Sequence, residues 1–244
     1  MRRNQRYRSV AGNPKELQEA SYRLPEHWTW ARGDRHWHLG VSAFVAKLLG
    51  ERLSGGEVLD LGCGDGKGTY DVQALLGSSF RLSGVDYSAR AIGFARLLAP
   101  GIAFHVGDAS ANGGRDRVYD AVIFREVLEH LDNQEMQRVP GALYRLLRPG
   151  GLLVLTTPHR CVPVSPKHFE HFDAEMLTAL LRRGGFAGIA FFGFGRVVPR
   201  LLVGLWNFLT DCVPVAWRVC RLTDVPTSPY RCRTLVAVAR RPSE

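Results

Sequence analysis

A cluster of glycines follows a short apolar run near residue 60. Glycine stands at positions 62, 64, 66 and 68, directly after residues 58–61, in which only Asp60 is polar. Such a run leading into glycines predicts a buried strand that ends in a tight turn, where backbone can approach a ligand. We interpret residues 58–68 as one wall of a small-molecule site. The alternative is an ordinary glycine-rich turn, because short motifs often occur by chance.

Two glutamates and a histidine follow a second apolar run. The segment REVLEHL places Glu126, Glu129 and His130 at i, i+3 and i+4. If a helix begins near Arg125, the three side chains share one of its faces at the mouth of the site. Two carboxylates and an imidazole can bind a divalent cation such as Mg²⁺, which would acidify a coordinated hydroxyl. The alternative is that acids in the first helical turn are favoured by the helix dipole alone.

Two further histidines stand in the segment SPKHFEHFDAEML, residues 165–177. We expect a helix to begin near Asp173, a suitable N-cap, so that His168 and His171 lie in the connection before it. Neutral imidazole accepts a proton near pH 7, which suits either histidine to the role of general base. The alternative is that a histidine only caps or orients this connection.

The elements that must position these residues alternate in type. From residue 57, short apolar runs alternate with helical patterns, which predicts βαβ units and a largely parallel sheet. Asp86 and Asp108 then stand at the carboxyl ends of successive strands, the rim where open α/β sheets bind ligands. Strands are expected at 57–61, 81–86, 101–108, 119–124, 152–158, 184–194 and 234–240.

The glycine turn lacks the dinucleotide fingerprint, which requires glycine or alanine at its sixth position. Counted from Gly62 that position is Lys67, and counted from Gly64 it is Thr69. A dehydrogenase that transfers hydride is therefore disfavoured. Asp86, 20 residues beyond Gly66, nevertheless has the spacing of an acid that binds ribose hydroxyls.

The motifs VLDLGCGDG, GVDYS, VGDA, YDAVIFREVLEHL and LLRPGGLLVLTTP resemble, in this order, those of class I S-adenosylmethionine-dependent methyltransferases. The resemblance covers about residues 55–190. It implies a Rossmann-like three-layer α/β sandwich, with a seven-stranded, mostly parallel sheet that has an antiparallel end. It also implies S-adenosylmethionine as the cofactor.

The resemblance assigns the cofactor's methionine end to the first glycine turn. Asp60, Gly62, Cys63 and Gly64 match positions that hold the amino-acid portion, and Arg125 matches a position whose backbone lines the methionine. A positive sulfonium tolerates a nearby acid, whereas a pyrophosphate would not.

The nucleoside end is assigned to the next two strand ends. Asp86 resembles the acid that accepts hydrogen bonds from both ribose hydroxyls, with Tyr87 beside the adenine. Asp108 and Ala109 resemble the pair that reads the adenine edge. For either acid alone, capping of a strand end is the alternative.

The pattern Glu-x-x-Glu-His resembles the metal site of ubiquinone-pathway O-methyltransferases and of small-RNA 2′-O-methyltransferases. It implies Glu126, Glu129 and His130 as metal ligands, with His168, which matches the family histidine, as the fourth. Many methyltransferases with no assigned metal share the pattern. The candidate catalytic groups are thus His168, His171, Glu129 and His130.

The net charge of +9 is concentrated at the two ends of the chain. Residues 1–35 carry +4, residues 36–181 carry −2 and residues 182–244 carry +7. The ends could face an anionic substrate, nucleic acid or a membrane surface, or form an arginine-rich solvated surface. The five cysteines include no Cys-x-x-Cys pair, which favours a reducing, cytoplasmic setting.

We divide the chain into four parts. Residues 1–54 form a basic arm and a helical cap, 55–194 the cofactor-binding core, 195–232 an apolar helical lid, and 233–244 the last core strand and tail. The three tryptophans of residues 28–37 are expected to pack the cap on the core, or alternatively to line a substrate mouth. Residues 197–222 could instead contact a membrane peripherally.

These observations predict O-methylation of a small-molecule acceptor. RNA 2′-O-methylation, with the Glu/Glu/His metal site and the basic ends, is the alternative activity. A cofactor-binding scaffold without catalysis is the alternative from a different class. The sequence does not name the acceptor or the oligomeric state.

Overall fold

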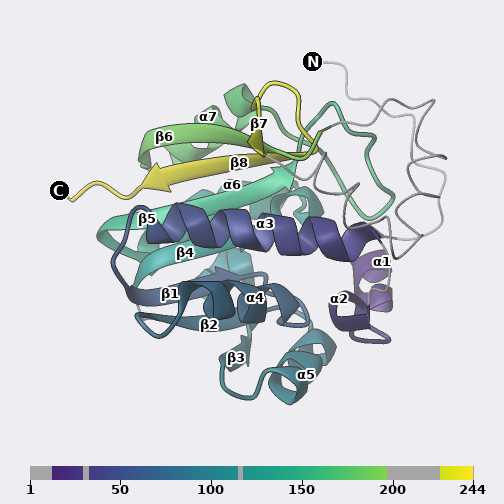
Figure 1. Cartoon of the computed structure of the whole chain (residues 1–244). Helices are drawn as coiled ribbons and strands as arrows, with labels where there is room; N and C mark the ends of the chain where they lie inside the picture. The colour runs from purple at the N-terminus through teal and green to yellow at the C-terminus, as the bar shows by residue number, and fades with distance from the viewer. Residues whose placement is uncertain (1–12, 30–32, 115–117, 197–225, 244) are drawn as a thin grey trace.

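The structure is a computed structural model that describes residues 13–29, 33–114, 118–196 and 226–243, with the main chain only for 33–36 and 112–114. Eight strands of these residues form one sheet. The sheet order is β3-β2-β1-β4-β5-β8-β6-β7 (Figure 1). The strands are β1 (Gly56–Leu61), β2 (Phe80–Asp86), β3 (Ala103–Val106), β4 (Tyr119–Arg125), β5 (Leu147–Pro158), β6 (Ala187–Phe194), β7 (Pro226–Thr227) and β8 (Thr234–Arg240).

The first five strands of the chain are parallel, and β8, β6 and β7 form an antiparallel end. The chain winds outward from β1 in both directions, so the order reverses between β1 and β4. Crevices at the carboxyl ends of strands at such a point are where open α/β sheets bind ligands. The glycine turn after β1 and the acidic segment after β4 therefore meet at one crevice.

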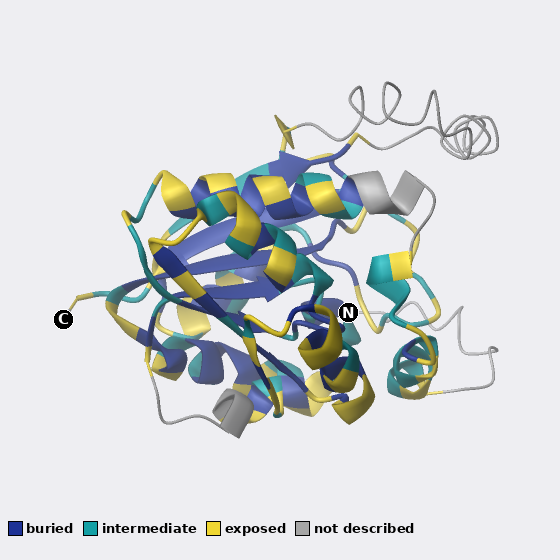
Figure 2. Ribbon diagram, turned by 60° about the horizontal axis from the view of Figure 1, so that its bottom comes forward, coloured by how far each residue is buried: buried dark blue, intermediate teal, exposed yellow. Residues whose placement is uncertain are grey.

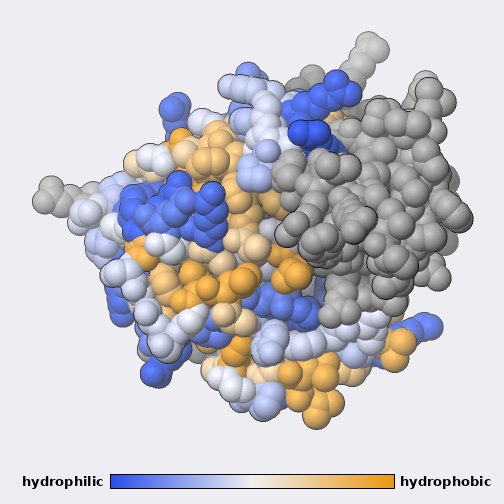
Figure 3. Space-filling view, in the orientation of Figure 1, coloured by the Kyte–Doolittle hydropathy of each residue, from blue (hydrophilic) through white to orange (hydrophobic). Residues whose placement is uncertain are grey.

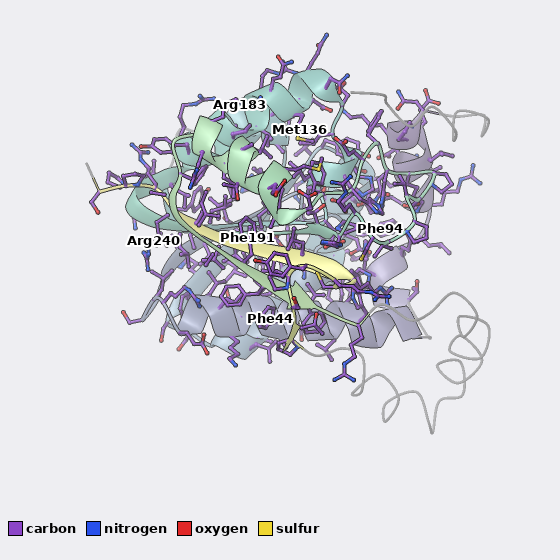
Figure 4. All side chains as sticks on the ribbon, turned by 90° about the horizontal axis from the view of Figure 1, so that it is seen from above. Phe44, Phe94, Met136, Arg183, Phe191 and Arg240 are labelled. Carbon is purple, nitrogen blue, oxygen red and sulfur yellow. The ribbon has the colours of Figure 1, made fainter. Side chains whose placement is uncertain are left out.

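Helices cover both faces of the sheet. The helices are α1 (Pro14–Ser21), α2 (Glu26–Thr29), α3 (Gly33–Gly50), α4 (Lys67–Leu76), α5 (Ala89–Leu98), α6 (Asn133–Leu146), α7 (Ala174–Arg183), and the 3₁₀ turns η1 (Ala109–Gly114) and η2 (Leu128–His130). Seen from above, α3 with Phe44 lies on one side of the sheet and α6 with Met136 on the other (Figure 4).

Each face of the sheet has its own apolar core. Residues of α3 and α4 pack on one face and residues of α6 and α7 on the other. Successive residues of β6 point to opposite faces, so Phe192 contacts Phe44 of α3 while Phe191 packs toward α6 and α7. Figure 2 shows buried strands between helices whose outer faces are exposed. The predicted α/β sandwich is confirmed.

The strand count exceeds the seven predicted by one. The additional strand is β7, only two residues long, which pairs antiparallel with β6 at Gly193 and Phe194. It lies inside the segment predicted as a helical lid, most of which falls outside the described residues. The four-part division of the chain stays a prediction.

The predicted helix beginning near Arg125 is wrong. Strand β4 continues through Arg125, Glu126 has a left-handed backbone (φ 53°), and only a 3₁₀ turn follows before α6 begins at Asn133. The reason is a capping box: Asp132 accepts hydrogen bonds from the first turn, and Glu135 accepts one from the Asp132 backbone. This box fixes the helix start after the acidic segment.

The third strand ends at Val106, two residues before its predicted end at Asp108. Gly107 still donates to the carbonyl of Asp86, but Asp108 then turns the chain by accepting a hydrogen bond from the Ser110 amide at 2.7 Å. An aspartate that bonds the backbone two residues on favours a turn over a strand. The predicted N-cap Asp173 is confirmed, and Ser88 caps α5 in the same way.

The outer side of α5 is apolar, as the lower part of Figure 3 shows. Leu97 and Leu98 on this helix and Val106 on the edge strand β3 are exposed. Within the described residues, no helix is both long enough and apolar enough to cross a bilayer. The predicted membrane contact concerns residues 197–222, which lie outside the described residues, and the cytoplasmic placement stays a prediction.

Candidate functional site

A cavity of about 370 Å³ opens at the crevice between β1 and β4. Its wall includes the glycine turn at Gly62, Cys63 and Gly64, and the acidic segment with Glu126 and Glu129. Helices α1 to α3, the connection after β5 and the start of β8 complete it. The cavity therefore joins the two groups of residues that the sequence motifs single out.

The glycine turn presents its backbone to the cavity. Gly62 and Gly64 have φ angles of 84° and 55°, which side chains rarely adopt. A Cβ on Gly62 would lie 2.2 Å from Val127, and a Cβ on Gly64 would lie 3.0 Å from the Tyr22 hydroxyl. These glycines are thus required both for the turn and for the space above it.

Asp60 lies under the turn, fully buried. Its Oδ2 accepts a hydrogen bond from the Thr69 hydroxyl at 2.7 Å and lies 3.8 Å from the Arg125 guanidinium, which also donates to Ser42 at 2.8 Å. Its Oδ1 is buried with no hydrogen-bond partner. Burial raises the pKa of Asp60, and Arg125 and Thr69 oppose this rise. Asp60 itself does not line the cavity, so its role at the amino-acid end of S-adenosylmethionine stays a prediction, with the unpaired oxygen as an available acceptor.

Asp86 is the last residue of β2 and is buried against the turn. One carboxylate oxygen accepts from the Gly64 amide and the other from the Ser88 amide, both at 2.9 Å. Burial raises its pKa to about 6, against the effect of these two bonds. Each oxygen retains a second lone pair that a ribose hydroxyl could use, but Asp86 does not line the cavity, so its ribose role stays a prediction. Tyr87 follows, 45% exposed, outside the cavity wall.

Asp108 and Ala109 do not line the cavity. Asp108 is exposed and bonds the Ser110 amide, and Ala109 packs on the core at the side of α6. Ser110, which the motifs did not single out, is 5% exposed, and its hydroxyl has no hydrogen-bond partner. The role of Asp108 and Ala109 in reading adenine stays a prediction.

Glu126 lines the cavity but stands apart from the other acidic and imidazole groups. Its carboxylate accepts a hydrogen bond from the Thr156 hydroxyl at 2.9 Å, and its amide donates to the Thr156 carbonyl at 2.9 Å. Burial raises its pKa to about 7. The hydrogen bonds to β5 hold this left-handed residue at the strand end.

Glu129, His130 and His168 form a compact group that could hold a metal ion. One ligand atom of each lies within 4.8 Å of the others, and Glu126 is not a member of the group. Glu129 is 1% exposed, accepts from the Thr157 hydroxyl at 3.1 Å, and lies 4.0 Å from Nε2 of His130. Three of the four predicted metal ligands are therefore together, on a 3₁₀ turn and a connection instead of one helical face.

Hydrogen bonds determine which nitrogen of each histidine is protonated. Nδ1 of His130 lies 2.9 Å from the Lys167 carbonyl, and Nδ1 of His171 lies 3.0 Å from the Val162 carbonyl. Carbonyls only accept, so both Nδ1 atoms carry hydrogen. Nε2 of neutral His171 then accepts from Nδ1 of His168 at 2.8 Å. His130 and His168 therefore keep Nε2 as a bare lone pair.

The histidines of this group are held neutral. Burial lowers the pKa of His130 to about 4 and that of His168 to about 3, and it also lowers the pKa of His171. Burial, and secondarily the charge of Glu126, raises the pKa of Glu129 well above its usual range. Neutral imidazoles with directed lone pairs are suited to bind a metal ion, whereas pKa values this low make them weak proton acceptors near pH 7.

The helical cap is attached to the glycine turn through Asp65, which the motifs did not single out. Asp65 is 1% exposed, accepts from the His27 amide and lies 2.9 Å from the His27 ring, while its carbonyl accepts from the Trp28 indole at 2.8 Å. Lys15 pairs with Glu135 at the start of α6. The aromatic residue Trp28 packs the cap onto the core, as predicted.

Sequence reasoning missed Thr69, Ser42 and Arg233. Thr69 and Ser42 support Asp60 and Arg125, and Arg233 lines the cavity. Trp37 also lines the cavity, which was the alternative stated for the three tryptophans. The position of Asp65 inside the glycine turn was a usable signal, because a buried carboxylate there needs hydrogen-bond donors from a neighbouring segment. No local pattern relates Trp37 to Arg233.

Comparisons with known proteins agree with this geometry. Residues 58–151 match the family described as a methyltransferase domain. A protein of Mycolicibacterium smegmatis named probable S-adenosylmethionine-dependent methyltransferase is 30% identical over 149 residues, covering 58% of this chain and 56% of that protein. The ubiquinone biosynthesis O-methyltransferase of Pseudomonas aeruginosa is 33% identical over 139 residues, covering 54% of this chain and 56% of that protein.

Solved structures share the fold. The S-adenosylmethionine-dependent methyltransferase of Thermotoga maritima has a TM-score of 0.63 at 18% identity, covering 86% of this chain and 91% of that one. The chain spans about half the length of the curated relatives it matches. The domain match, these relatives and the shared fold agree: residues 58–151 match a methyltransferase domain, and the chain is similar to class I S-adenosylmethionine-dependent methyltransferases in sequence and in fold.

Proposed function

We propose that this chain transfers the methyl group of S-adenosylmethionine to a hydroxyl of a small-molecule acceptor. The observation that carries the proposal is the group Glu129, His130 and His168, which lies on the same cavity as the glycine turn. Bare imidazole nitrogens and a carboxylate suit the activation of a hydroxyl. The cofactor supplies a methyl carbon that is already electrophilic, so the protein must align the acceptor and remove its proton.

The chain's own residues divide this work. The glycine turn, Asp60 and Asp86 would hold the cofactor, with Arg125 balancing the charge of Asp60. A divalent cation held by the Glu129 group would supply Lewis acidity toward an acceptor hydroxyl. Without a cation, the bare Nε2 atoms of His130 and His168 are the available proton acceptors.

The donor set bears on the identity of the cation. Two imidazoles and one carboxylate suit Zn²⁺, Fe²⁺ or Ni²⁺ better than Mg²⁺, which prefers oxygen ligands. Zn²⁺ therefore replaces Mg²⁺ as the first cation to test. The relative from Pseudomonas aeruginosa, named as an O-methyltransferase, supports transfer to oxygen.

A transfer assay with labelled cofactor on extract fractions tests the proposal. We expect label in a small-molecule fraction, and loss of most labelling after chelation and in Glu129→Gln. Full activity in both would remove the cation from the mechanism. Label in the RNA fraction, with binding that weakens as salt rises, would replace the small-molecule acceptor by RNA. Cofactor binding without any labelled product would favour a scaffold.

A further inference from the structure

Trp37 and Arg233 form a pair on the cavity wall, far apart in the sequence. The guanidinium of Arg233 lies 4.5 Å above the centre of the Trp37 ring. Trp37 belongs to α3, and Arg233 directly precedes β8. Both side chains line the cavity that contains the glycine turn and the Glu129 group.

The indole nitrogen of Trp37 is buried without a partner. Trp37 is 6% exposed, and among the described residues nothing accepts a hydrogen bond from its Nε1. Buried indole N–H groups usually find an acceptor, so an orphan in a cavity wall indicates that a ligand supplies one. A cation stacked on the same ring indicates that this acceptor carries negative charge.

The space beside the pair is kept open by a glycine. Gly195 has a φ angle of 76°, and a Cβ there would lie 3.1 Å from the Cβ of Arg233 and 3.6 Å from Nε1 of Trp37.

The pair lies on the acceptor's side of the cavity. The cofactor turn follows β1 and contacts Asp86 on β2, whereas Arg233 stands before β8, beyond β4 and β5 in the sheet order. The segment with Glu126 and Glu129 follows β4, between these two regions. A ligand group at Trp37 and Arg233 would therefore belong to the molecule that receives the methyl group.

We propose that Trp37 and Arg233 form a subsite for an anionic group of the acceptor, a carboxylate or a phosphate. This inference rests on the proposed function, because it treats the cavity as the acceptor site. The acceptor would carry an anionic group at one end and the reacting hydroxyl at the other. Arg233 supplies the charge and Trp37 a directed hydrogen bond, so the pair determines specificity without touching the reacting atoms.

Calorimetry with three probes tests this subsite in the full chain loaded with S-adenosylhomocysteine. Benzoate and phenyl phosphate carry the two candidate anions, and benzamide is their neutral match. We expect one anion, or both, to bind at least about tenfold more tightly than benzamide, as a hydrogen bond to a charged group provides. The stronger of the two anions identifies the acceptor's group. Equal binding of all three probes, or no binding, would overturn the inference.

Variants separate the two side chains. Arg233→Gln should lower anion affinity at least about tenfold, and Trp37→Phe, which keeps the stacked ring but removes Nε1–H, about threefold to tenfold. Arg241→Gln is the matched control, because Arg241 stacks on Tyr144 at the same 4.5 Å outside the cavity. It should leave anion affinity unchanged.

Binding of S-adenosylhomocysteine to each variant verifies that the variant is folded. Unchanged anion affinity in Arg233→Gln with intact cofactor binding would overturn the subsite. If the anionic probes do not bind but the chain still transfers methyl groups and loses that activity on chelation, the subsite is overturned and the proposed function stands. Failure of transfer in the unaltered chain would instead count against the proposed function.

Discussion

The two walls of the cavity are built in different ways. The wall that we propose holds the cofactor, here the cofactor wall, consists of the glycine turn and the strand end beside it, where the Gly64 amide bonds Asp86. The wall that we propose faces the acceptor, here the acceptor wall, consists of side chains from separate elements, such as His130 after β4 and His168 after β5. The first wall depends on backbone conformation, whereas the second depends on a chain of hydrogen bonds between side chains.

This difference predicts how each wall fails. A change in the cofactor wall should act through steric fit and charge and alter cofactor affinity. A change in the acceptor wall should act through the orientation and tautomer of the histidines and leave cofactor affinity nearly intact.

The largest effect should follow removal of a metal-ligand oxygen from the acceptor wall. Glu129→Gln should weaken binding of Zn²⁺ by about 100-fold to 1000-fold, because an amide cannot supply the charge of a carboxylate ligand. Calorimetric titration of the full chain with Zn²⁺ measures this, with cofactor affinity expected to change less than about threefold.

Glu126→Gln is the matched control for Glu129→Gln. Glu126 is also buried and acidic, but it is bonded to Thr156 and lies outside the group. Its variant should keep Zn²⁺ affinity within about threefold. A loss as large as that of Glu129→Gln would restore Glu126 as a ligand, as the sequence motif predicted.

The next effect concerns steric fit of the cofactor wall. Gly62→Ala should destabilise the fold by about 2–4 kcal/mol, from the left-handed backbone and from the contact of its Cβ with Val127 at 2.2 Å. Gly188→Ala has a positive φ of 57° but nothing within 4 Å of the added Cβ, so it should cost only about 1–2 kcal/mol. Urea unfolding of both variants measures the difference, and equal costs would show that close contact plays no part.

The sequence located the glycine turn of the cofactor wall because the determinants of that turn are local. Glycines at a strand end constrain one turn, and an acid 20 residues beyond Gly66 reports the end of the next strand. The strand end predicted at Asp108 was wrong, because this side chain accepts a hydrogen bond from the Ser110 amide and the strand ends earlier, at Val106. The motif therefore located the segment around Asp108 correctly but did not predict which atoms its side chain contacts.

The acceptor wall was predicted only in part because its determinants are tertiary. The composition of Glu129, His130 and His168 indicated a metal site, but the helical spacing that related them was wrong. The group instead depends on the connection after β5, which returns to place His168 beside His130, with ring centres 4.7 Å apart. No hydrophobic periodicity or residue spacing in the sequence predicts that the connection after β5 brings His168 next to His130.

A smaller loss of Zn²⁺ affinity should follow when a residue that orients a ligand, but is not itself a ligand, is replaced in the acceptor wall. His171→Phe leaves Nδ1–H of His168 without an acceptor, so the bare Nε2 is no longer enforced. We expect about tenfold weaker Zn²⁺ binding, as for other residues that orient metal ligands. His171→Gln, whose carbonyl can accept from His168, should recover most of the affinity.

His159→Phe serves as the control for His171→Phe. His159 is equally buried at 5% exposure, but its Nδ1 accepts from the Cys161 amide and it does not line the cavity. Its variant should bind Zn²⁺ as the unaltered chain does. If Phe and Gln at position 171 behave alike, the hydrogen bond to His168 does not orient the ligand.

The smallest effect is a pH dependence confined to the cofactor wall. The pKa of Asp86 is raised to about 6 without cofactor, so below that pH the carboxyl is largely protonated. Two ribose hydroxyls would favour the carboxylate, so cofactor binding should release a proton. Affinity should then rise about tenfold, about 1.4 kcal/mol, between pH 5 and pH 7. Calorimetry in buffers of different ionisation enthalpy measures both affinity and proton release.

The stability of the cofactor-free fold should change with pH in the direction opposite to cofactor affinity. Because the folded pKa of Asp86 is raised, the cofactor-free fold binds more protons than the unfolded chain and loses stability as pH rises from the usual carboxyl range to about 6. Cofactor should oppose that loss.

Asp86→Asn should abolish both trends, and Asp86→Ala should weaken cofactor binding by about 1–3 kcal/mol. If Asp86→Asn kept the rise in affinity, the titrating group would lie elsewhere, and the nucleoside end would not depend on this carboxylate.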